Sequence, residues 1–274
     1  MSLISVDELA ERLADPDRDT VVCDVRFYLA DHGQGRREYE AGHIPGAVFV
    51  DVHTDLASHR PGAGRHPLPT VEEFTALLGR LGIAPASFVV AYDSAGGATA
   101  SRLWWMLRSI GHGQVAVLDG GLPAWVAAGH PTAGGSEHRP GTNYPPAGEW
   151  TGIVDADAVA EGVALGATLV DARAPERFRG EVEPLDAKAG HIPGAVNRYH
   201  ADSVGPDGRH LPLPELVAHF AGIGESPIVY CGSGVTACHA LLAMSLVGVP
   251  QARLYPGSWS EWSSDPERPV ATGT

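Results

Sequence analysis

Cys231 is the residue whose type and position are best suited to chemistry. It follows the apolar run 227–230 and precedes the loop 232–236, after which an apolar helical stretch begins. Backbone N–H groups and the positive end of a helix dipole both favour the thiolate, which is the nucleophilic form of cysteine. Gly232 and Gly234 allow the backbone to curl so that several N–H groups point inward and form an anion-binding nest. The pattern predicts a reactive thiol, and a buried, inert cysteine beside a tight turn is the alternative interpretation.

A cysteine at the end of a predicted strand lies where open α/β sheets bind their ligands, beyond the carboxyl ends of the strands. Ser5-x-x-Glu8 and Thr70-x-x-Glu73 are capping boxes that predict helix starts. Short apolar, β-branched runs predict buried strands. The predicted strands are 21–24, 47–50, 88–91, 115–118, 168–170, 195–196, 228–230 and 252–254, with helices near 214–221 and 234–247. This alternation predicts two doubly wound α/β domains.

The chain also contains an internal repeat. The block AGHIPGAV occurs at 41–48 and again, unchanged, at 189–196. Other matches keep the same order along the chain, namely Asp24-Val-Arg26 with Asp171-Ala-Arg173, Val90-Ala-Tyr-Asp93 with Ile228-Val-Tyr-Cys231, and Trp125 with Trp262. A duplicated domain is therefore predicted, with copies at 1–133 and 150–274 joined by a Gly- and Pro-rich linker at 134–149. Asp93 stands in the first copy where Cys231 stands in the second, so the first copy is predicted to be catalytically silent.

Composition excludes several classes of function. The 274 residues carry a net charge of −14, which argues against nucleic-acid or anionic-membrane binding. No apolar run approaches the ~20 residues that span a bilayer, and the amino-terminal residues do not resemble a secretory signal. The three cysteines are too few for a disulfide framework and lack C-x-x-C metal spacing. We expect a reduced, cytoplasmic protein without a metal or cofactor.

Several motifs together resemble the tandem-domain sulfurtransferases of the rhodanese superfamily. They are the loop Cys231-Gly-Ser-Gly-Val-Thr-Ala, the duplicated Gly-His-Ile-Pro-Gly-Ala and the segment Gly257-Ser-Trp-Ser-Glu-Trp262. The resemblance implies two rhodanese-like domains, each a parallel sheet with helices on both faces. It also implies that Cys231 takes sulfur as a persulfide from 3-mercaptopyruvate or thiosulfate and passes it to cyanide or a thiol, including that of a thioredoxin-like protein. Gly232 directly after the cysteine is typical of the mercaptopyruvate type, since thiosulfate enzymes usually carry arginine there.

The resemblance further assigns individual site residues. Ser233, His66 and Asp51 match a relay that helps to deprotonate the donor thiol or orient its leaving group, and Arg177 matches an arginine that binds the anionic donor. The loop residues expected to contact substrate are Gly232, Gly234, Val235 and Thr236. Leu185 stands where mercaptopyruvate enzymes usually carry a second arginine. An ion pair of Arg177 with Glu176 or Glu181 is the alternative for that residue.

Other interpretations remain open from the sequence alone. Cysteine-dependent phosphatases need an arginine six residues after the cysteine, but that position holds Ala237. A persulfide carrier that loads sulfur without turnover fits the same motifs. Cys23 and Cys238 are interpreted as core residues, with a resolving thiol as the alternative for Cys238. His43 and His191 occur in both copies of the repeat, which favours a structural role for both.

Overall fold

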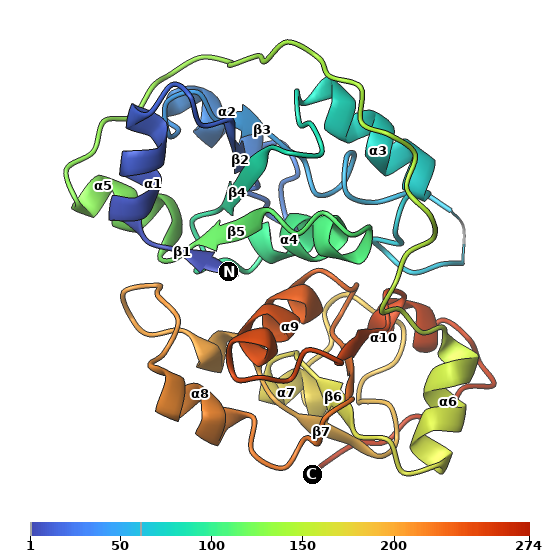
Figure 1. Cartoon of the computed structure of the whole chain (residues 1–274). Coiled ribbons are helices and arrows are strands. Elements are labelled where there is room, and N and C mark those ends of the chain that lie inside the picture. Colours follow the sequence, from blue (N-terminus) through green and yellow to red (C-terminus); the bar gives the residue numbers. More distant parts are fainter. Residues whose placement is uncertain (1, 61) are drawn as a thin grey trace. The chain divides into compact units, whose positions relative to one another are not determined.

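The computed structural model describes residues 2–60 and 62–274 and contains two compact α/β units (Figure 1). Two short segments are exchanged between the halves of the sequence. The first unit consists of Met1–Ser58, Pro69–Thr151 and Val204–His210, and the second of His59–Leu68, Gly152–Ser203 and Leu211–Thr274. None of the described helices is long and apolar enough to cross a membrane.

The first unit is built on a five-stranded parallel sheet in the order β1-β5-β4-β2-β3. Its strands are β1 (Leu3–Ile4), β2 (Thr20–Asp24), β3 (Val48–Phe49), β4 (Phe88–Tyr92) and β5 (Val115–Leu118). Its helices are α1 (Val6–Ala14), α2 (Gln34–Ala41), α3 (Val71–Arg80), α4 (Ala100–Ser109) and α5 (Gly121–Ala127). The predicted capping boxes at Ser5 and Thr70 are both present at the starts of α1 and α3.

The second unit repeats this plan with a four-stranded parallel sheet in the order β7-β6-β8-β9. Its strands are β6 (Leu169–Asp171), β7 (Ala195–Asn197), β8 (Ile228–Tyr230) and β9 (Arg253–Leu254). Its helices are α6 (Ala156–Ala164), α7 (Pro175–Phe178), α8 (Leu213–His219), α9 (Thr236–Leu246) and α10 (Ser258–Trp262), with a 3-10 turn, η1 (His200–Ser203). All strand pairs are parallel, so the predicted α/β class is confirmed.

Each sheet is covered by helices on both faces, as expected for central strands that are buried along their whole length, such as β2 and β8, whereas the edge strand β7 is partly exposed. In the first unit, Leu9 of α1 and Trp125 of α5 pack with Val90 of β4 on one face, while α4 contacts β4 and β5. In the second unit, Val159 of α6 and Trp259 of α10 form the corresponding cluster, and α9 contacts β8 and β9. Asp93 and Cys231 directly follow β4 and β8, at the carboxyl ends of these central strands.

The duplicated block has the same structural role in both units. The Nδ1 atom of His43 lies 2.8 Å from the carbonyl oxygen of Tyr39, and that of His191 lies 2.8 Å from the carbonyl oxygen of Phe178. Each imidazole also stacks on the ring of the same partner. A carbonyl can only accept, so Nδ1 donates in both cases. The structural role predicted for the two histidines agrees with these contacts.

The predicted strands agree with the observed ones to within one residue at each end, but some elements have no counterpart among the predicted ones. Strand β1, the turn η1 and six helices lie outside the predicted ranges, namely α2, α4, α5, α6, α7 and α10. Residues 134–149 contain neither helix nor strand, and part of this segment is bonded to the first unit. The Thr142 N–H, for example, donates to the carbonyl oxygen of Gly79 at 2.9 Å.

Candidate active site

Cys231 lies between the end of β8 and the start of α9, and its exposed fraction is only 1%. The loop curls back on the sulfur, so that the N–H of Gly234 donates to Sγ at 3.2 Å. Gly234 has φ +76°, a left-handed conformation that suits glycine. The turn at residue 234 therefore points a backbone N–H at the thiol, and this contact stabilises negative charge on sulfur.

A second segment, residues 257–260, holds this loop in place. The N–H groups of Trp259 and Ser260 donate at 3.0 Å to the carbonyl oxygens of Cys231 and Gly232 respectively. The Cys231 N–H donates to the Oγ of Ser258, which in turn donates to the carbonyl oxygen of Tyr255. Ser258 adopts φ +53°, an unusual conformation for a residue with a side chain. This strained backbone places the hydroxyl where it accepts the amide N–H of Cys231.

His66 and Ser233 form the side-chain contact that the resemblance implied. His66 belongs to the segment His59–Leu68, which is part of the second unit. Its Nδ1 lies 2.8 Å from the Oγ of Ser233, and both side chains are buried. An imidazole bonded to a hydroxyl two residues after the cysteine can accept and return a proton.

Asp51, the third residue of the predicted relay, belongs to the first unit. Its Oδ1 accepts the N–H groups of His53 and Thr54 at 2.7 and 3.0 Å. These bonds cap its own turn, and a role for Asp51 in the relay stays a prediction. Val235 is buried and precedes the first residue of α9, Thr236, which is half-buried. Contacts of either residue with substrate also stay predictions.

Arg177 forms ion pairs, but not with the acidic residues considered from the sequence. Its Nη2 donates to Glu183 Oε1 and Oε2 at 2.7 and 2.9 Å, and it lies 3.3 Å from Asp186 Oδ2. The carboxylates of Glu183 and Asp186 are buried, with 3% and 6% of their side chains exposed. Arg177 therefore neutralises buried charge in addition to any contact with a donor.

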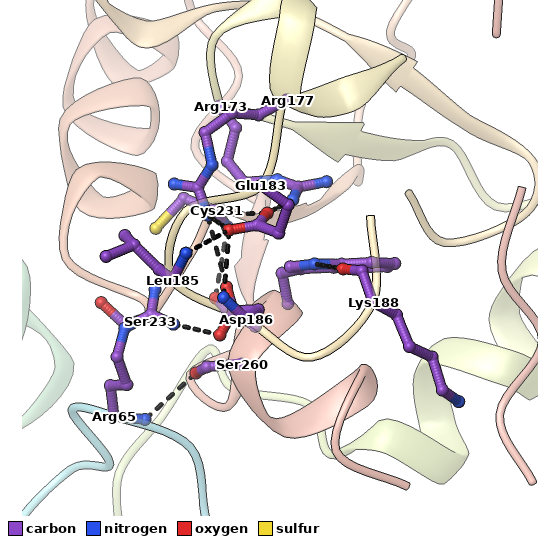
Figure 2. Close-up of polar contacts among 12 residues, drawn as sticks. Arg65, Arg173, Arg177, Glu183, Leu185, Asp186, Lys188, Cys231, Ser233 and Ser260 are labelled. Atoms are coloured by element: carbon purple, nitrogen blue, oxygen red, sulfur yellow. Dashed lines mark hydrogen bonds and ion pairs between the residues drawn. The ribbon is translucent and has the colours of Figure 1, made fainter. Parts of the chain in front are cut away.

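Arg65 reaches the same carboxylate from a distant part of the chain. Its Nη1 donates to Asp186 Oδ1, so Asp186 is shared between Arg65 and Arg177, as Figure 2 shows. Burial raises the pKa of the Asp186 carboxyl above its ordinary value, and Glu183 acts in the same direction, whereas Arg65 and Arg177 oppose the rise. No local sequence pattern predicts the parts played by Arg65, Glu183, Asp186, Ser258 and Ser260. The last two lie in the segment 257–262, which contributes to the family resemblance.

The corresponding loop of the first unit is filled by the Asp93 carboxylate. Asp93 is 1% exposed and follows β4 as Cys231 follows β8. Its oxygens accept the N–H groups of Ala95, Gly97, Thr99 and Ala100 and the hydroxyl of Thr99, at 2.8 to 3.0 Å. The loop thus binds an anion supplied by the protein itself, which supports the interpretation of the first copy as silent.

The other two cysteines lie in the core. Complete burial raises the pKa of Cys23, in β2, to about 12, which suppresses its thiolate. The Sγ of Cys238, in α9, lies 3.3 Å from the carbonyl oxygen of Gly234 and donates to it. Within the described residues no disulfide joins the three cysteines, and no cluster of metal-ligating side chains is found.

Comparison with known proteins agrees with this geometry. The rhodanese-like domain family matches residues 5–128 and again 155–265. A Pseudomonas aeruginosa protein named as a probable 3-mercaptopyruvate sulfurtransferase is 47% identical, covering 99% of this chain and 98% of that protein. The 3-mercaptopyruvate sulfurtransferase of Homo sapiens is 36% identical, with coverage of 99% and 96%. The solved structure of 3-mercaptopyruvate sulfurtransferase from Leishmania major has a TM-score of 0.84 at 32% identity, covering 96% of this chain and 74% of that one.

The chain therefore belongs to the rhodanese family and contains two rhodanese-like domains. Its similarity over nearly the full length to curated sulfurtransferases identifies it as a sulfurtransferase.

Proposed function

We propose that the protein transfers sulfur through a persulfide on Cys231, with 3-mercaptopyruvate as its principal donor and thiosulfate as the weaker one. The observation that carries this proposal is the Gly234 N–H aimed at Sγ, 3.2 Å away, at the junction of a strand and a helix. The donor assignment is supported by the names of the Pseudomonas aeruginosa and human relatives and by Gly232, which is typical of the mercaptopyruvate type.

The first half-reaction moves one sulfur atom from donor to enzyme. The Cys231 thiolate attacks the donor sulfur, an S–S bond forms, and the C–S bond of mercaptopyruvate breaks with its electron pair going to carbon. The proton of the donor thiol must then reach that carbon, which yields pyruvate and the persulfide anion. We assign this proton transfer to Ser233 and His66, which are 2.8 Å apart. Donor-anion binding is assigned to Arg177 and the loop 232–236.

The second half-reaction returns the enzyme to its starting state. Cyanide attacks the outer sulfur of the persulfide, giving thiocyanate and the Cys231 thiolate, and a thiol acceptor such as a thioredoxin-like protein reacts at the same atom. Neither half-reaction requires a cofactor. We also propose that residues 1–133 act as a silent domain, since Asp93 cannot form a persulfide, and that 150–274 is the catalytic domain.

Mass spectrometry of the intact protein tests the persulfide directly. After treatment with 3-mercaptopyruvate and removal of excess donor, the wild type gains the mass of one sulfur atom on the peptide that contains Cys231. Cys231→Ser neither gains this mass nor forms thiocyanate from cyanide. Cys238→Ser is the matched control, because it changes a cysteine seven residues away in the same segment and is expected to keep most of the activity.

Two results would overturn the assignment. Sulfur found on Cys23 or Cys238 would show that the nucleophile is misidentified. Loading of Cys231 without any turnover to cyanide or a small thiol would indicate a persulfide carrier that acts only with a protein partner.

A further inference from the structure

The rhodanese resemblance leaves one position of the donor site unexplained. Leu185 stands where a second arginine is expected, and it is 44% exposed. Its backbone N–H donates to Glu183 Oε1, but an aliphatic side chain cannot bind an anion. If mercaptopyruvate is the donor, another cation must take the place of the missing arginine.

We propose that Arg65, from the segment His59–Leu68, is this second donor-binding arginine and determines specificity together with Arg177. This inference rests on the proposed function. The key geometry is found at Gly232, the residue after the nucleophile. A Cβ atom built on Gly232 would lie 2.9 Å from Arg65 Nη2 and 3.4 Å from Arg177 Nη1. The two guanidinium groups therefore converge on one point directly beside Cys231.

The atoms that converge are not the ones that hold the carboxylates. Arg177 uses Nη2 for Glu183 and Asp186, and Arg65 uses Nη1 for Asp186, which leaves Arg177 Nη1 and Arg65 Nη2 toward Gly232. The Nε atoms of both arginines are also buried without a hydrogen-bond partner among the described residues. The donors that the pair can offer to a ligand are therefore Arg177 Nη1 and Arg65 Nη2.

Arg65 is positioned by the segment that positions the catalytic loop. Its backbone N–H donates to Ser260 Oγ at 3.1 Å, and the Ser260 N–H donates to the carbonyl oxygen of Gly232 at 3.0 Å. The next residue, His66, contacts Ser233. Two consecutive residues, 65 and 66, therefore face two consecutive residues of the loop, 232 and 233. Arg65 is fixed at the site even though 121 positions separate it in sequence from Asp186.

The charges define the ligand that this arrangement suits. The positive charges of Arg65 and Arg177 are balanced by Glu183 and Asp186, so the four side chains are together neutral when ionised. A small anion held there gains directed N–H donors more than net positive charge. Two guanidinium groups that offer adjacent N–H donors suit a planar carboxylate, which accepts one donor on each oxygen. We assign the carboxylate of a 2-oxo acid to this pair.

Binding can be measured without sulfur transfer. In the Cys231→Ser background, calorimetry with pyruvate, the product that keeps the carboxylate and keto group, reports on the anion site alone. Arg65→Gln should weaken pyruvate binding at least about 10-fold. Arg65→Lys keeps the charge but not the planar fork and should fall in between. Arg179→Gln is the matched control, because Arg179 pairs with Glu181 at the surface of the same unit, and it should bind like the parent protein.

Steady-state kinetics in the protein that retains Cys231 distinguishes a role of Arg65 in donor binding from a role in positioning His66. Arg65→Gln should raise the KM for 3-mercaptopyruvate about 10- to 100-fold with little change in kcat. The inference is overturned if pyruvate binding and KM are unchanged, or if kcat falls while KM does not, since Arg65 would then act only by placing His66. Absence of persulfide formation in the wild type would instead refute the proposed function, and the pyruvate measurement would still test Arg65.

Discussion

The imidazole of His66 and the hydroxyl of Ser233 are joined by a 2.8 Å hydrogen bond within the second unit, although 167 positions separate them in sequence. Only 3% of His66 and 9% of Ser233 is exposed, so the pair is shielded from bulk water. If the pair acts as the proposed proton relay, it serves only a reaction that moves a proton. This condition distinguishes the two candidate donors.

Loss of the His66–Ser233 contact should affect the two donors unequally. Mercaptopyruvate must transfer its thiol proton to carbon, whereas thiosulfate releases sulfite without any proton transfer. His66→Gln and Ser233→Ala should each lower kcat for mercaptopyruvate about 100-fold, but lower it for thiosulfate by less than about 5-fold. The double variant should be no slower than the worse single variant, because both residues serve one step. Equal losses with both donors would assign the pair a structural role.

Arg177 should contribute to both donor binding and stability, because it pairs with the buried carboxylates of Glu183 and Asp186. Arg177→Leu should lower kcat/KM about 10- to 100-fold through loss of a charge-assisted contact. It should also reduce the free energy of unfolding by about 2 kcal/mol, since two buried carboxylates lose a partner. Arg177→Lys, which keeps the charge, should recover more of the stability than of the kcat/KM. A variant with unchanged kcat/KM for both donors would place the donor site elsewhere.

Alanine substitution should affect donor binding at Gly232 but stability at Gly234. Gly232 does not have a left-handed φ, and its added Cβ would meet mainly the movable end of Arg65, so Gly232→Ala should fold normally and raise the donor KM several-fold. Gly234 has φ +76°, and its added Cβ would lie 2.5 Å from the carbonyl oxygen of Pro256. Gly234→Ala should therefore lose more than about 2 kcal/mol of stability. Thermal unfolding and steady-state kinetics on both variants distinguish these outcomes, and a stable, fully active Gly234→Ala would contradict the loop geometry.

The fold could be predicted from the sequence because its signals are local. Buried parallel strands are short β-branched runs, and capping boxes mark the starts of the helices that follow Ser5 and Thr70. The repeated block then shows that the plan occurs twice. The position of Cys231 can be predicted in the same way, because the strand, the glycines and the helix around it are neighbours in sequence.

The rest of the site depends on contacts that no local pattern records. Arg65 lies in a Gly- and Pro-rich stretch with no periodicity. Its place at the site becomes evident only from its contact with Asp186 in the folded structure. Distance along the chain also predicts the wrong ion-pair partners for Arg177. Glu176 and Glu181 are closer along the chain, but the loop after α7 turns Glu183 and Asp186 toward the guanidinium instead.

Asp93 should be important for stability, although it is not expected to act in catalysis. Asp93→Ala leaves four backbone N–H groups in a buried loop without their acceptor, and each such loss costs about 1–3 kcal/mol unless water enters. We expect a loss of at least about 3 kcal/mol in urea unfolding. Asp93→Asn keeps one acceptor oxygen and should fall between the wild type and the alanine variant. A neutral effect of Asp93→Ala would mean that the loop does not need an anion.

The stability of the first unit should decrease in mild acid because of His112. Its imidazole is 4% exposed, and burial lowers its pKa below the ordinary value of 6.5. Nε2 lies 3.1 Å from the carbonyl oxygen of Ser87 and must donate, so neutral Nδ1 accepts from the Tyr144 hydroxyl at 3.0 Å. Both ring nitrogens are thus satisfied in the neutral form.

The direction of the effect follows from proton binding in the two states. Below about pH 6.5 the unfolded chain protonates this histidine while the folded protein does not, so stability present above that pH is lost as pH falls toward the folded-state pKa. His112→Gln removes the titrating group, and its melting temperature should fall less than that of the wild type between pH 7 and pH 5. His138→Gln, which changes an exposed imidazole, should follow the wild-type profile. If His112→Gln retains the full acid sensitivity of the wild type, other groups account for it and the neutral buried imidazole does not.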